Sequence, residues 1–453
     1  MNRLEIGFSA VNITPCEGIG IAGYFIPRFV KGVLDDIYTQ ALAVRCGEST
    51  ALLISVDNVG LKDTLIREIA EKIERETGVS RDAVLIGATH SHTAPLLYKT
   101  EAFEADVSKI DAYREELKEK ITEAARLALS DLSPARMGFG RGHAPDRIAY
   151  IRRYRMKDGT TMTCPPIDDP NIEGPIGELD REVNIIRFKR EGARDVVLLN
   201  FGLHADTVNG DLISADWPCW LRRTVDAALG ADCMFFPGAE GDVGSTNVHP
   251  VPSDMNDTEI SFDNEMKSPG MARFVGRALA GVVLQVYDKV EFSEVEDIST
   301  ARRVILVPSN KPKPSDMPRA REYKRLHDEG RDDLIPYTAM ELTTVVAEAL
   351  RMCRLENAPD FFELELIGLR LGDIALVGLP GEPFTDIGVA IKKLGGYDMI
   401  LPIAQMNGDE GYFPSRQAFD EGGYEARSSH YVAGIDSLIV DGAKSVLAEL
   451  GNG

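Results

Sequence analysis

Short apolar segments that resemble β-strands alternate along this chain with longer amphipathic segments that resemble helices. The first clear strand covers residues 51–57, and another covers 83–89. Between them, apolar residues spaced by three and four predict a helix over about 65–73, which Gly78 is placed to end. A second helix is expected over about 107–130, with apolar residues on one face and charged residues four apart on the other. This alternation is typical of α/β proteins.

The rest of the chain continues the strand pattern and interrupts it with polar segments. Further strands are expected at 194–203, 232–236, 300–307, 362–369 and 373–379. Three segments look like excursions from the core: the Pro-rich run 160–182, the polar loop 249–264 and the charged segment 311–336. The sequence has no internal repeat and no linker that would divide it. We therefore expect one domain over 1–453, with a layered, mixed β-sheet core flanked by helices.

Charge and cysteine content exclude several functional classes. The 453 residues include 50 Lys and Arg against 72 Asp and Glu, a formal charge of −22, and no basic tract that would bind nucleic acid or an anionic membrane. No apolar run reaches the ~18–20 residues that span a bilayer, and the N-terminus has no apolar segment of signal-peptide length. The six Cys form no CxxC pair, which argues against a thiolate metal site or a disulfide framework. We therefore expect a cytoplasmic protein.

Four of the apolar strands end abruptly in side chains that bind metals or transfer protons. The endings are His90-Ser-His92, His204-Ala-Asp206, Glu240-Gly-Asp242 and Glu382. In proteins whose sheets are covered by helices, the ends of the strands and the loops after them converge on a common crevice in which ligands bind. We therefore predict that the four endings meet at one site.

Three of the seven His in the chain lie at these endings, which indicates a metal site. On an extended segment His90 and His92 would project to the same side, because strand side chains alternate. Two imidazoles and a carboxylate form a common catalytic zinc set that leaves a coordination position for water. Zinc lowers the pKa of such a water toward ~7, which supplies hydroxide at neutral pH. On their own, these residues predict a mononuclear metal site and leave the reaction open.

At these residues the chain resembles the catalytic domain of the neutral/alkaline (non-lysosomal) ceramidase family. Thr89-His-Ser-His-Thr-Ala-Pro95 is similar to the family signature Thr-His-Thr-His-x-x-Pro. Further segments are similar to family segments in the same order: 7–15, Phe201-Gly-Leu-His204 followed by Ile213-Ser-Ala-Asp216, Gly241-Asp-Val243 and Leu379-Pro-Gly-Glu382. The combination extends over nearly the whole chain. The resemblance implies a ceramidase-like α/β catalytic domain.

The resemblance also implies a set of zinc ligands. The family holds zinc with the first His of the signature, a later His, the Glu of Pro-Gly-Glu and a Tyr near the end of the domain. These positions correspond here to His90, His204, Glu382 and Tyr412. The family shows two tyrosines twelve residues apart, and Tyr412 and Tyr424 have that spacing, with Tyr424-Glu425 similar to the family's Tyr-Glu.

The same resemblance assigns residues that act on the substrate. His92 would be a proton shuttle or an oxyanion donor, and Tyr424 would contact the carbonyl or its oxyanion. A family Arg near the active site falls in Tyr150-Ile-Arg-Arg-Tyr154, where Arg152 is the first choice and Arg153 the second. The roles of three further acids are left open: Asp216, Glu240 and Asp242.

The resemblance predicts a zinc-dependent hydrolase that cleaves a carboxamide with metal-activated water. Here Gly-Asp-Val is followed by Gly244-Ser-Thr-Asn247, where the family has Ser-Pro-Asn. We also expect neither the family's C-terminal β-sandwich domain nor the secretion signal of many members. These departures make a small polar amide an alternative to ceramide as the small-molecule substrate.

Other interpretations keep the metal or replace the fold. An ester or lactone hydrolase or a lyase would use the same polarised carbonyl, so the sequence does not separate these reactions from amide hydrolysis. A TIM-barrel amidohydrolase needs more His ligands after the first pair than His204 provides, and a metallo-β-lactamase needs Asp at the position of Ala94. A binding protein without catalysis is disfavoured, because every candidate ligand type is present.

Overall fold

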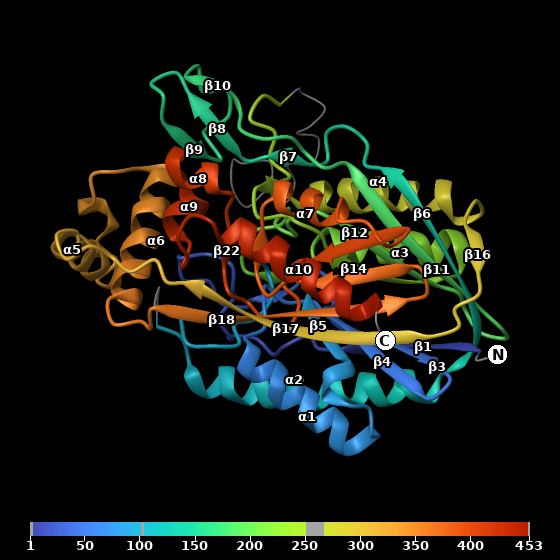
Figure 1. Ribbon diagram of the computed structural model, residues 1–453. Helices are drawn as coiled ribbons and strands as arrows, with labels where there is room; N and C mark the ends of the chain where they lie inside the picture. Colours follow the sequence, from blue (N-terminus) through green and yellow to red (C-terminus); the bar gives the residue numbers. More distant parts are fainter. Residues whose placement is uncertain (1–2, 101–103, 251–266, 452–453) are drawn as a thin grey trace.

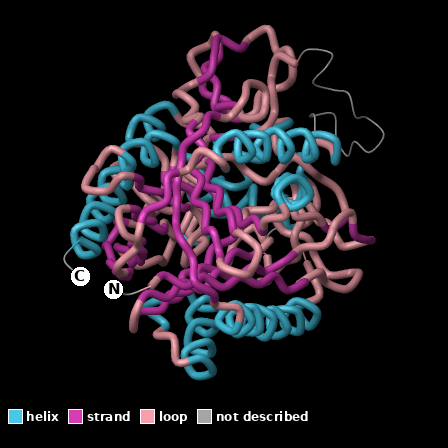
Figure 2. Tube along the Cα trace, turned by 90° about the vertical axis from the view of Figure 1, so that its right-hand side faces the viewer, coloured by secondary structure: helices cyan, strands magenta, loops and turns pink. Residues whose placement is uncertain are grey.

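The computed structural model describes residues 3–100, 104–250 and 267–451, in which two mixed β-sheets pack between layers of helices (Figure 1). Inward-facing apolar side chains of the two sheets belong to one hydrophobic cluster, which includes Leu52 and Ile54 from one sheet and Leu369 and Leu401 from the other. Figure 2 shows the strands enclosed by helices below and above. The expected α/β fold, with a layered mixed sheet flanked by helices, is confirmed.

The larger sheet has nine strands in the order β14-β12-β11-β6-β1-β3-β4-β5, with β16 beside β6. Most neighbours run antiparallel, but β4 and β5 run parallel, as do β12 and β14. The strands are β1 (Leu4–Asn12), β3 (Tyr38–Cys46), β4 (Ser49–Val56), β5 (Val84–Ala88), β6 (Ser133–His143), β11 (Glu182–Arg190), β12 (Val196–Phe201), β14 (Asp232–Pro237) and β16 (Glu291–Ser293).

The smaller sheet has four strands in the order β17-β18-β19-β21, of which β19 and β21 run parallel. Its strands are β17 (Ile298–Pro308), β18 (Phe361–Leu371), β19 (Ile374–Gly378) and β21 (Met399–Ile403). Every strand that the sequence predicted is present in one of the two sheets.

Helices cover the outer faces of both sheets. Helices α1 (Asp63–Thr77) and α2 (Val107–Ser130) lie below the larger sheet in Figure 1, where α2 packs on β1 and β3. Helices α3 (Trp217–Leu229) and α4 (Pro269–Tyr287) cover β11, β12 and β14. Helices α7 (Thr385–Lys392) and α10 (Ile435–Gly451) cover the smaller sheet.

Local sequence signals account for the helix boundaries. Helix α2 begins after Asp106, whose carboxylate accepts hydrogen bonds from the backbone N–H groups of Ser108 and Lys109. Helix α1 ends at Gly78, whose left-handed φ of 77° favours glycine. The two helices predicted from apolar spacing are therefore confirmed.

The two ends of the larger sheet approach each other. Ser55 Oγ, on β4, donates a hydrogen bond to the carbonyl of Phe235, on β14, over 3.0 Å. The segment that follows β21 contacts both ends, because Ala404 N donates to Pro237 O at 3.0 Å and Asn407 N donates to Ile86 O at 2.8 Å. The carboxyl ends of the parallel pairs β4–β5, β12–β14 and β19–β21 therefore meet at one place.

Short elements join the loops around this meeting point. Three two-residue strand pairs form: β2 (Gly32–Val33) with β13 (Leu212–Ile213), β7 (Tyr150–Ile151) with β15 (Val243–Gly244), and β20 (Glu382–Pro383) with β22 (Tyr412–Phe413). Short helices in the described part of the chain include η1 (Arg81–Ala83), α8 (Arg416–Glu421) and α9 (Tyr424–Ser428).

Two of the three segments expected as excursions carry secondary structure of their own. In 160–182, β9 (Thr161–Thr163) and β10 (Ile172–Pro175) pair with β8 (Arg153–Met156) at the top of Figure 1. In 311–336, α5 (Met317–Asp328) packs on α6 (Ala339–Leu355), and η3 (Asp332–Leu334) contacts α5. Of the loop expected at 249–264, residues 251–264 lie outside the described residues. No described helix has the length and apolar character needed to cross a bilayer.

Candidate metal centre

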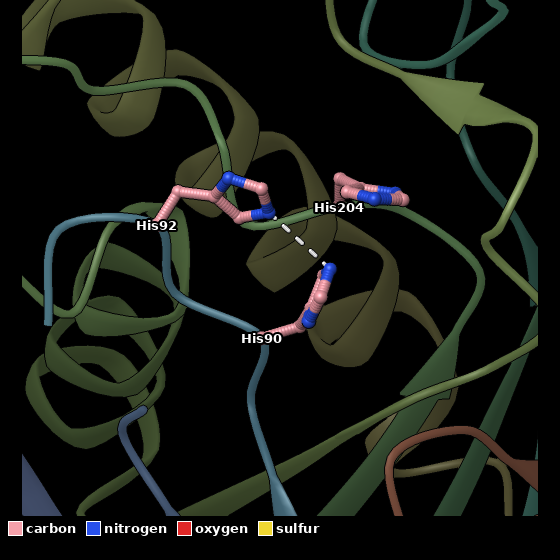
Figure 3. A group of neighbouring side chains, drawn as sticks. All are labelled: His90, His92 and His204. Atoms are coloured by element: carbon pink, nitrogen blue, oxygen red, sulfur yellow. Dashed lines mark hydrogen bonds between the residues drawn. The ribbon is translucent and has the colours of Figure 1, made fainter. Parts of the chain in front are cut away.

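The ends of β5, β12 and β19 bring three of the expected metal ligands together inside the protein. Glu382 Oε2 lies 3.4 Å from His90 Nε2 and 3.2 Å from His204 Nε2. The imidazole of His92 joins them, with its Nε2 3.2 Å from that of His90, as the dashed line in Figure 3 shows. One nitrogen of each buried imidazole lies within 4.8 Å of the others, which is close enough for one metal ion. Three of the four strand endings therefore meet here, and the fourth contacts them through the carbonyl of Glu240, 2.9 Å from His204 Nδ1, so the endings converge as the sequence predicted.

The path of the chain at the signature differs from the expectation. His90 has a left-handed φ of 62°, so the segment after β5 is not extended, and the expected alternation along a strand is wrong. The turn is fixed by backbone hydrogen bonds, since Ser91 N donates to Asn58 O and His92 N donates to Ala205 O, both at 3.1 Å. The two imidazoles reach the centre because of this turn.

Hydrogen bonds behind two of the imidazoles fix their orientation. His90 Nδ1 lies 2.6 Å from the carbonyl of Val59, and His204 Nδ1 lies 2.9 Å from the carbonyl of Glu240. A carbonyl oxygen only accepts, so both Nδ1 atoms carry a hydrogen, and the Nε2 atoms of both rings face Glu382. This is the arrangement by which proteins orient histidines that bind metals.

The charges at the centre suit a cation. Burial raises the pKa of Glu382, but its contact with His90 outweighs this and keeps the carboxyl ionised. Burial and the nearby Arg152 lower the pKa of His204 to about 4, so this ring is neutral at pH 7. His204 Nε2 and Glu382 Oε2 have no hydrogen-bond partner among the described residues. A cation between them would satisfy both atoms, so the residues fit a bound metal.

Tyr412 and Tyr424 border the same centre. Tyr412 pairs with Glu382 in the parallel β20–β22 ladder, which places the two expected ligands on neighbouring strands. The rings of Tyr412 and Tyr424 are 5.6 Å apart and nearly perpendicular. Arg152 Nη2 donates to the hydroxyl of Tyr412 at 3.0 Å and to the carbonyl of Gly241 at 2.8 Å.

The two arginine candidates point to different places. Arg152 follows β7 and is positioned by the β7–β15 pair, since its backbone N–H donates to Asp242 O at 2.9 Å. Arg153 lies away from Tyr412: its Nη2 donates to the carbonyl of Gly422 at 3.0 Å and to Glu421 at 3.2 Å. The structure therefore places Arg152, the first choice, beside the centre.

Two of the acids whose roles the sequence left open support the backbone of the site. Asp242 Oδ1 accepts from both the N–H and the hydroxyl of Thr385 at 2.8 Å, at the start of α7 and just after Glu382. Asp216 is fully buried and accepts from the N–H groups of Thr207 and Val208, each at 2.8 Å. Both carboxylates therefore hold the segments that carry proposed ligands.

Glu240, the third of these acids, has a different environment. Its side chain is fully buried, and neither carboxyl oxygen has a hydrogen-bond partner among the described residues. Burial raises its pKa to about 8, and the neighbouring charges of His90, Glu382 and Arg152 act on it as well. A neutral, protonated carboxyl at pH 7 is therefore part of the wall of this centre.

Sequence reasoning missed the polar group beside His92. Asp206 stands at a predicted strand ending without an assigned role, and no sequence motif includes Tyr24 and Lys267, which bind it. Both lie in loops far from Asp206 in the sequence, so no pattern connected the three residues.

Comparison with solved structures identifies the fold. The crystal structure of neutral ceramidase from Pseudomonas aeruginosa matches with a TM-score of 0.71 and 16% sequence identity, over 99% of this chain and 75% of that chain. A structure of ceramidase complexed with C2 matches with the same TM-score and identity, over 99% of this chain and 76% of that chain. No protein-family model and no curated protein sequence matches the chain. The chain therefore has the fold of neutral ceramidase, as its sequence motifs indicated.

Proposed function

We propose that this protein is a zinc-dependent hydrolase that cleaves the C–N bond of carboxamides. The observation that carries the proposal is the position of one Glu382 oxygen, 3.4 Å from His90 Nε2 and 3.2 Å from His204 Nε2. Two imidazoles and a carboxylate, with the phenol of Tyr412 nearby, form a nitrogen and oxygen donor set that suits zinc and leaves room for substrate. The likeness in fold to neutral ceramidase supports the same chemistry.

Bound to these residues, zinc would supply a Lewis acid that polarises the scissile carbonyl and lowers the pKa of water. In our proposal, His92 moves the proton. It accepts one proton from the attacking water at Nε2 and gives one to the leaving nitrogen, so that the C–N bond breaks and His92 ends unchanged. Burial lowers the pKa of this ring well below the ordinary value, so the ring is neutral at pH 7 and has a nitrogen that can accept a proton.

Tyr424 and Arg152 are proposed to stabilise the oxyanion that forms on the carbonyl carbon. Burial raises the pKa of Tyr424, so its hydroxyl keeps the hydrogen that it would donate. Arg152 adds a positive charge next to Tyr412, with its Nη2 3.0 Å from that hydroxyl. Removing one donor of this kind typically costs ~10²–10³ in rate.

We place the substrate among small polar amides. The side chains that pack behind His92 are polar: Tyr24, Asp206 and Lys267. Polar surroundings of the reaction centre favour substrates that form hydrogen bonds over long acyl chains. None of the six Cys, all of which lie in the described part of the chain, forms a disulfide, which supports a cytoplasmic location, where thiols stay reduced.

The test measures zinc content and hydrolysis together. We expect the purified protein to contain about one zinc per chain and to hydrolyse N-acyl aminocoumarins, with acetyl preferred over palmitoyl. His204→Ala should lose both the metal and the activity, whereas the exposed His143→Ala should keep both. Full activity in a metal-free His204→Ala variant would refute the proposal. The corresponding coumarin esters test the alternative, because an ester hydrolase would cleave them and leave the amides intact.

A further inference from the structure

The imidazole of His92 has a carboxylate on the side that faces away from the centre. Its Nδ1 lies 3.9 Å from Asp206 Oδ1 and has no hydrogen-bond partner among the described residues. The side chain of His92 is 11% exposed and that of Asp206 is 18% exposed, so water competes little for this contact. Asp206 is therefore the group best placed to accept a hydrogen from His92 Nδ1.

Two buried donors fix the Asp206 carboxylate. The Tyr24 hydroxyl donates to Oδ1, and Lys267 Nζ lies 2.9 Å from Oδ2 and 2.6 Å from the Tyr24 hydroxyl. The Lys267 side chain is only 11% exposed, so it is a buried counter-ion for Asp206. The carboxylate behind His92 is therefore held in one place.

The loop that carries Tyr24 also fixes the ring of His92. Gly23 has a left-handed φ of 100°, and a Cβ at this position would lie 2.8 Å from His92 Nδ1. The ring of Tyr24 stands edge-on to His92 at 5.7 Å, and the Arg28 guanidinium lies 4.1 Å from the centre of the Tyr24 ring. Arg28 Nη2 also donates to the carbonyl of His92 at 2.8 Å. The geometry therefore leaves His92 little freedom to turn away from Asp206.

The three imidazoles of the centre differ in what lies behind them. Carbonyl oxygens, which are neutral, face the Nδ1 atoms of His90 and His204. Only for His92 is the facing group a carboxylate. His92 is thus the one of these three imidazoles whose tautomer a neighbouring side chain, rather than a backbone carbonyl, can select.

We propose that Asp206 is a positioning residue for His92: it accepts the Nδ1 hydrogen, selects that tautomer and directs the Nε2 lone pair to the reaction centre, while Tyr24 and Lys267 hold the carboxylate. The catalytic part of this role rests on the proposed function. The tautomer itself is a property of the folded protein that does not depend on the substrate.

The test is ¹⁵N NMR of the histidine rings in the full-length protein, with and without zinc. With seven His in the chain, His92→Gln identifies the His92 signals by their loss. We expect the Nδ1–H tautomer in the wild type and the Nε2–H tautomer in Asp206→Asn, because the new amide donates to Nδ1. Asp195→Asn is a matched control: its carboxylate is bound by the Tyr287 hydroxyl at 2.7 Å and by Arg187 at 2.9 Å, and its loss should leave the His92 signals unchanged.

Tyr24→Phe provides a second variant that retains the carboxylate and removes one of its donors. We expect it to populate both tautomers of His92. If His92 has the same tautomer in the wild type, in Tyr24→Phe and in a folded Asp206→Asn, the proposal is wrong.

Kinetic measurements then test whether the contact between Asp206 and His92 contributes to catalysis. With an aminocoumarin amide that the wild type cleaves, Asp206→Asn should lower kcat by ~10²-fold or more, with KM and zinc content within about twofold of the wild type. Asp206→Asn should cost little further in the His92→Gln background, because both changes act through one group. Additive losses would refute the positioning role. A protein with the expected tautomers and no amidase activity would refute the proposed function and leave the Asp206–His92 relationship standing.

Discussion

His204 Nε2 and Glu382 Oε2 lie 3.2 Å apart, yet neither has a hydrogen-bond partner among the described residues. Two buried acceptors at this distance repel each other unless a cation or a proton lies between them. In the metal-free protein the proton belongs to His90: burial lowers its pKa, but the carboxylate of Glu382 outweighs this and raises it above the ordinary value. A metal at this site must displace that proton.

The affinity for zinc should therefore rise with pH. His204 and Glu382 carry no proton at neutral pH, so His90 releases one proton and Tyr412, if it binds as a phenolate, releases another. We expect log K to increase by about two per pH unit between about pH 6 and about pH 8. Tyr412→Phe should reduce the slope to about one. Titration against a competing chelator measures both slopes, and equal slopes would remove the Tyr412 phenolate from the ligand set.

Glu240→Gln should change how the stability of the metal-free protein depends on pH. Burial raises the pKa of Glu240 to about 8, so the native state keeps a proton that the unfolded chain releases near pH ~4.3. Between these values the native state binds more protons, and its free energy of unfolding therefore falls as pH rises. The side chain of the Glu240→Gln variant cannot ionise, so its free energy of unfolding should fall less as pH rises. The difference from the wild type should be at most about 1.4 kcal/mol for each unit by which the native pKa of Glu240 exceeds its unfolded pKa.

Urea unfolding at several pH values measures this difference. Asp216 and Asp242 also have raised pKa values, about 7 and about 6, and contribute to the slope of both proteins. Only the difference between wild type and variant reports Glu240. Parallel curves for the two proteins would show that the carboxyl is ionised throughout this pH range.

The proposed histidine and glutamate ligands could be found from the sequence because each comes shortly after an apolar strand. His90, His204 and Glu382 come two, three and four residues after the last residues of β5, β12 and β19, and the carboxyl ends of parallel strands gather where a sheet fold binds its ligands. Tyr412 had no such signal. It lies in a two-residue strand beyond the loop after β21, and only the resemblance to ceramidases indicated it.

The curvature of the larger sheet could not be predicted, because long-range hydrogen bonds create it. Strand β3 (Tyr38–Cys46) was not predicted. It buries Thr39 and Gln40, and the Gln40 amide donates to Cys233 O on β14 at 3.0 Å. Buried polar residues of this kind interrupt the apolar pattern from which strands are recognised. The same contacts bring β14 close to β4 and β5, and so bring Glu240 close to His90.

Glu425→Gln should destabilise the protein strongly. Glu425 is fully buried, and its Oε1 lies 2.8 Å from Nε of Arg152, whose side chain is 12% exposed. Removing the carboxylate leaves a buried guanidinium without its counter-ion, which costs about 3 kcal/mol of unfolding free energy or more. Asp328→Asn removes the partner of Lys324 in an exposed pair and should cost less than about 0.5 kcal/mol. Chemical denaturation measures both losses of unfolding free energy. Similar losses would show that the buried pair contributes no more to stability than the exposed pair.

Two glycines in one segment allow a matched test of how the backbone supports Glu382. A Cβ on Gly241 would lie 2.5 Å from the carbonyl oxygen of Glu382, whereas a Cβ on Gly244 would come no closer than 3.7 Å, to the side chain of Arg152. Gly241→Ala must therefore displace the backbone of a proposed ligand, because Gly241 N also donates to Pro383 O at 2.9 Å. We expect zinc affinity to fall by about tenfold or more in Gly241→Ala, as for other changes behind metal ligands, and to stay within about twofold in Gly244→Ala. If Gly241→Ala binds zinc as the wild type does, the close packing of these two strand endings does not determine the position of Glu382.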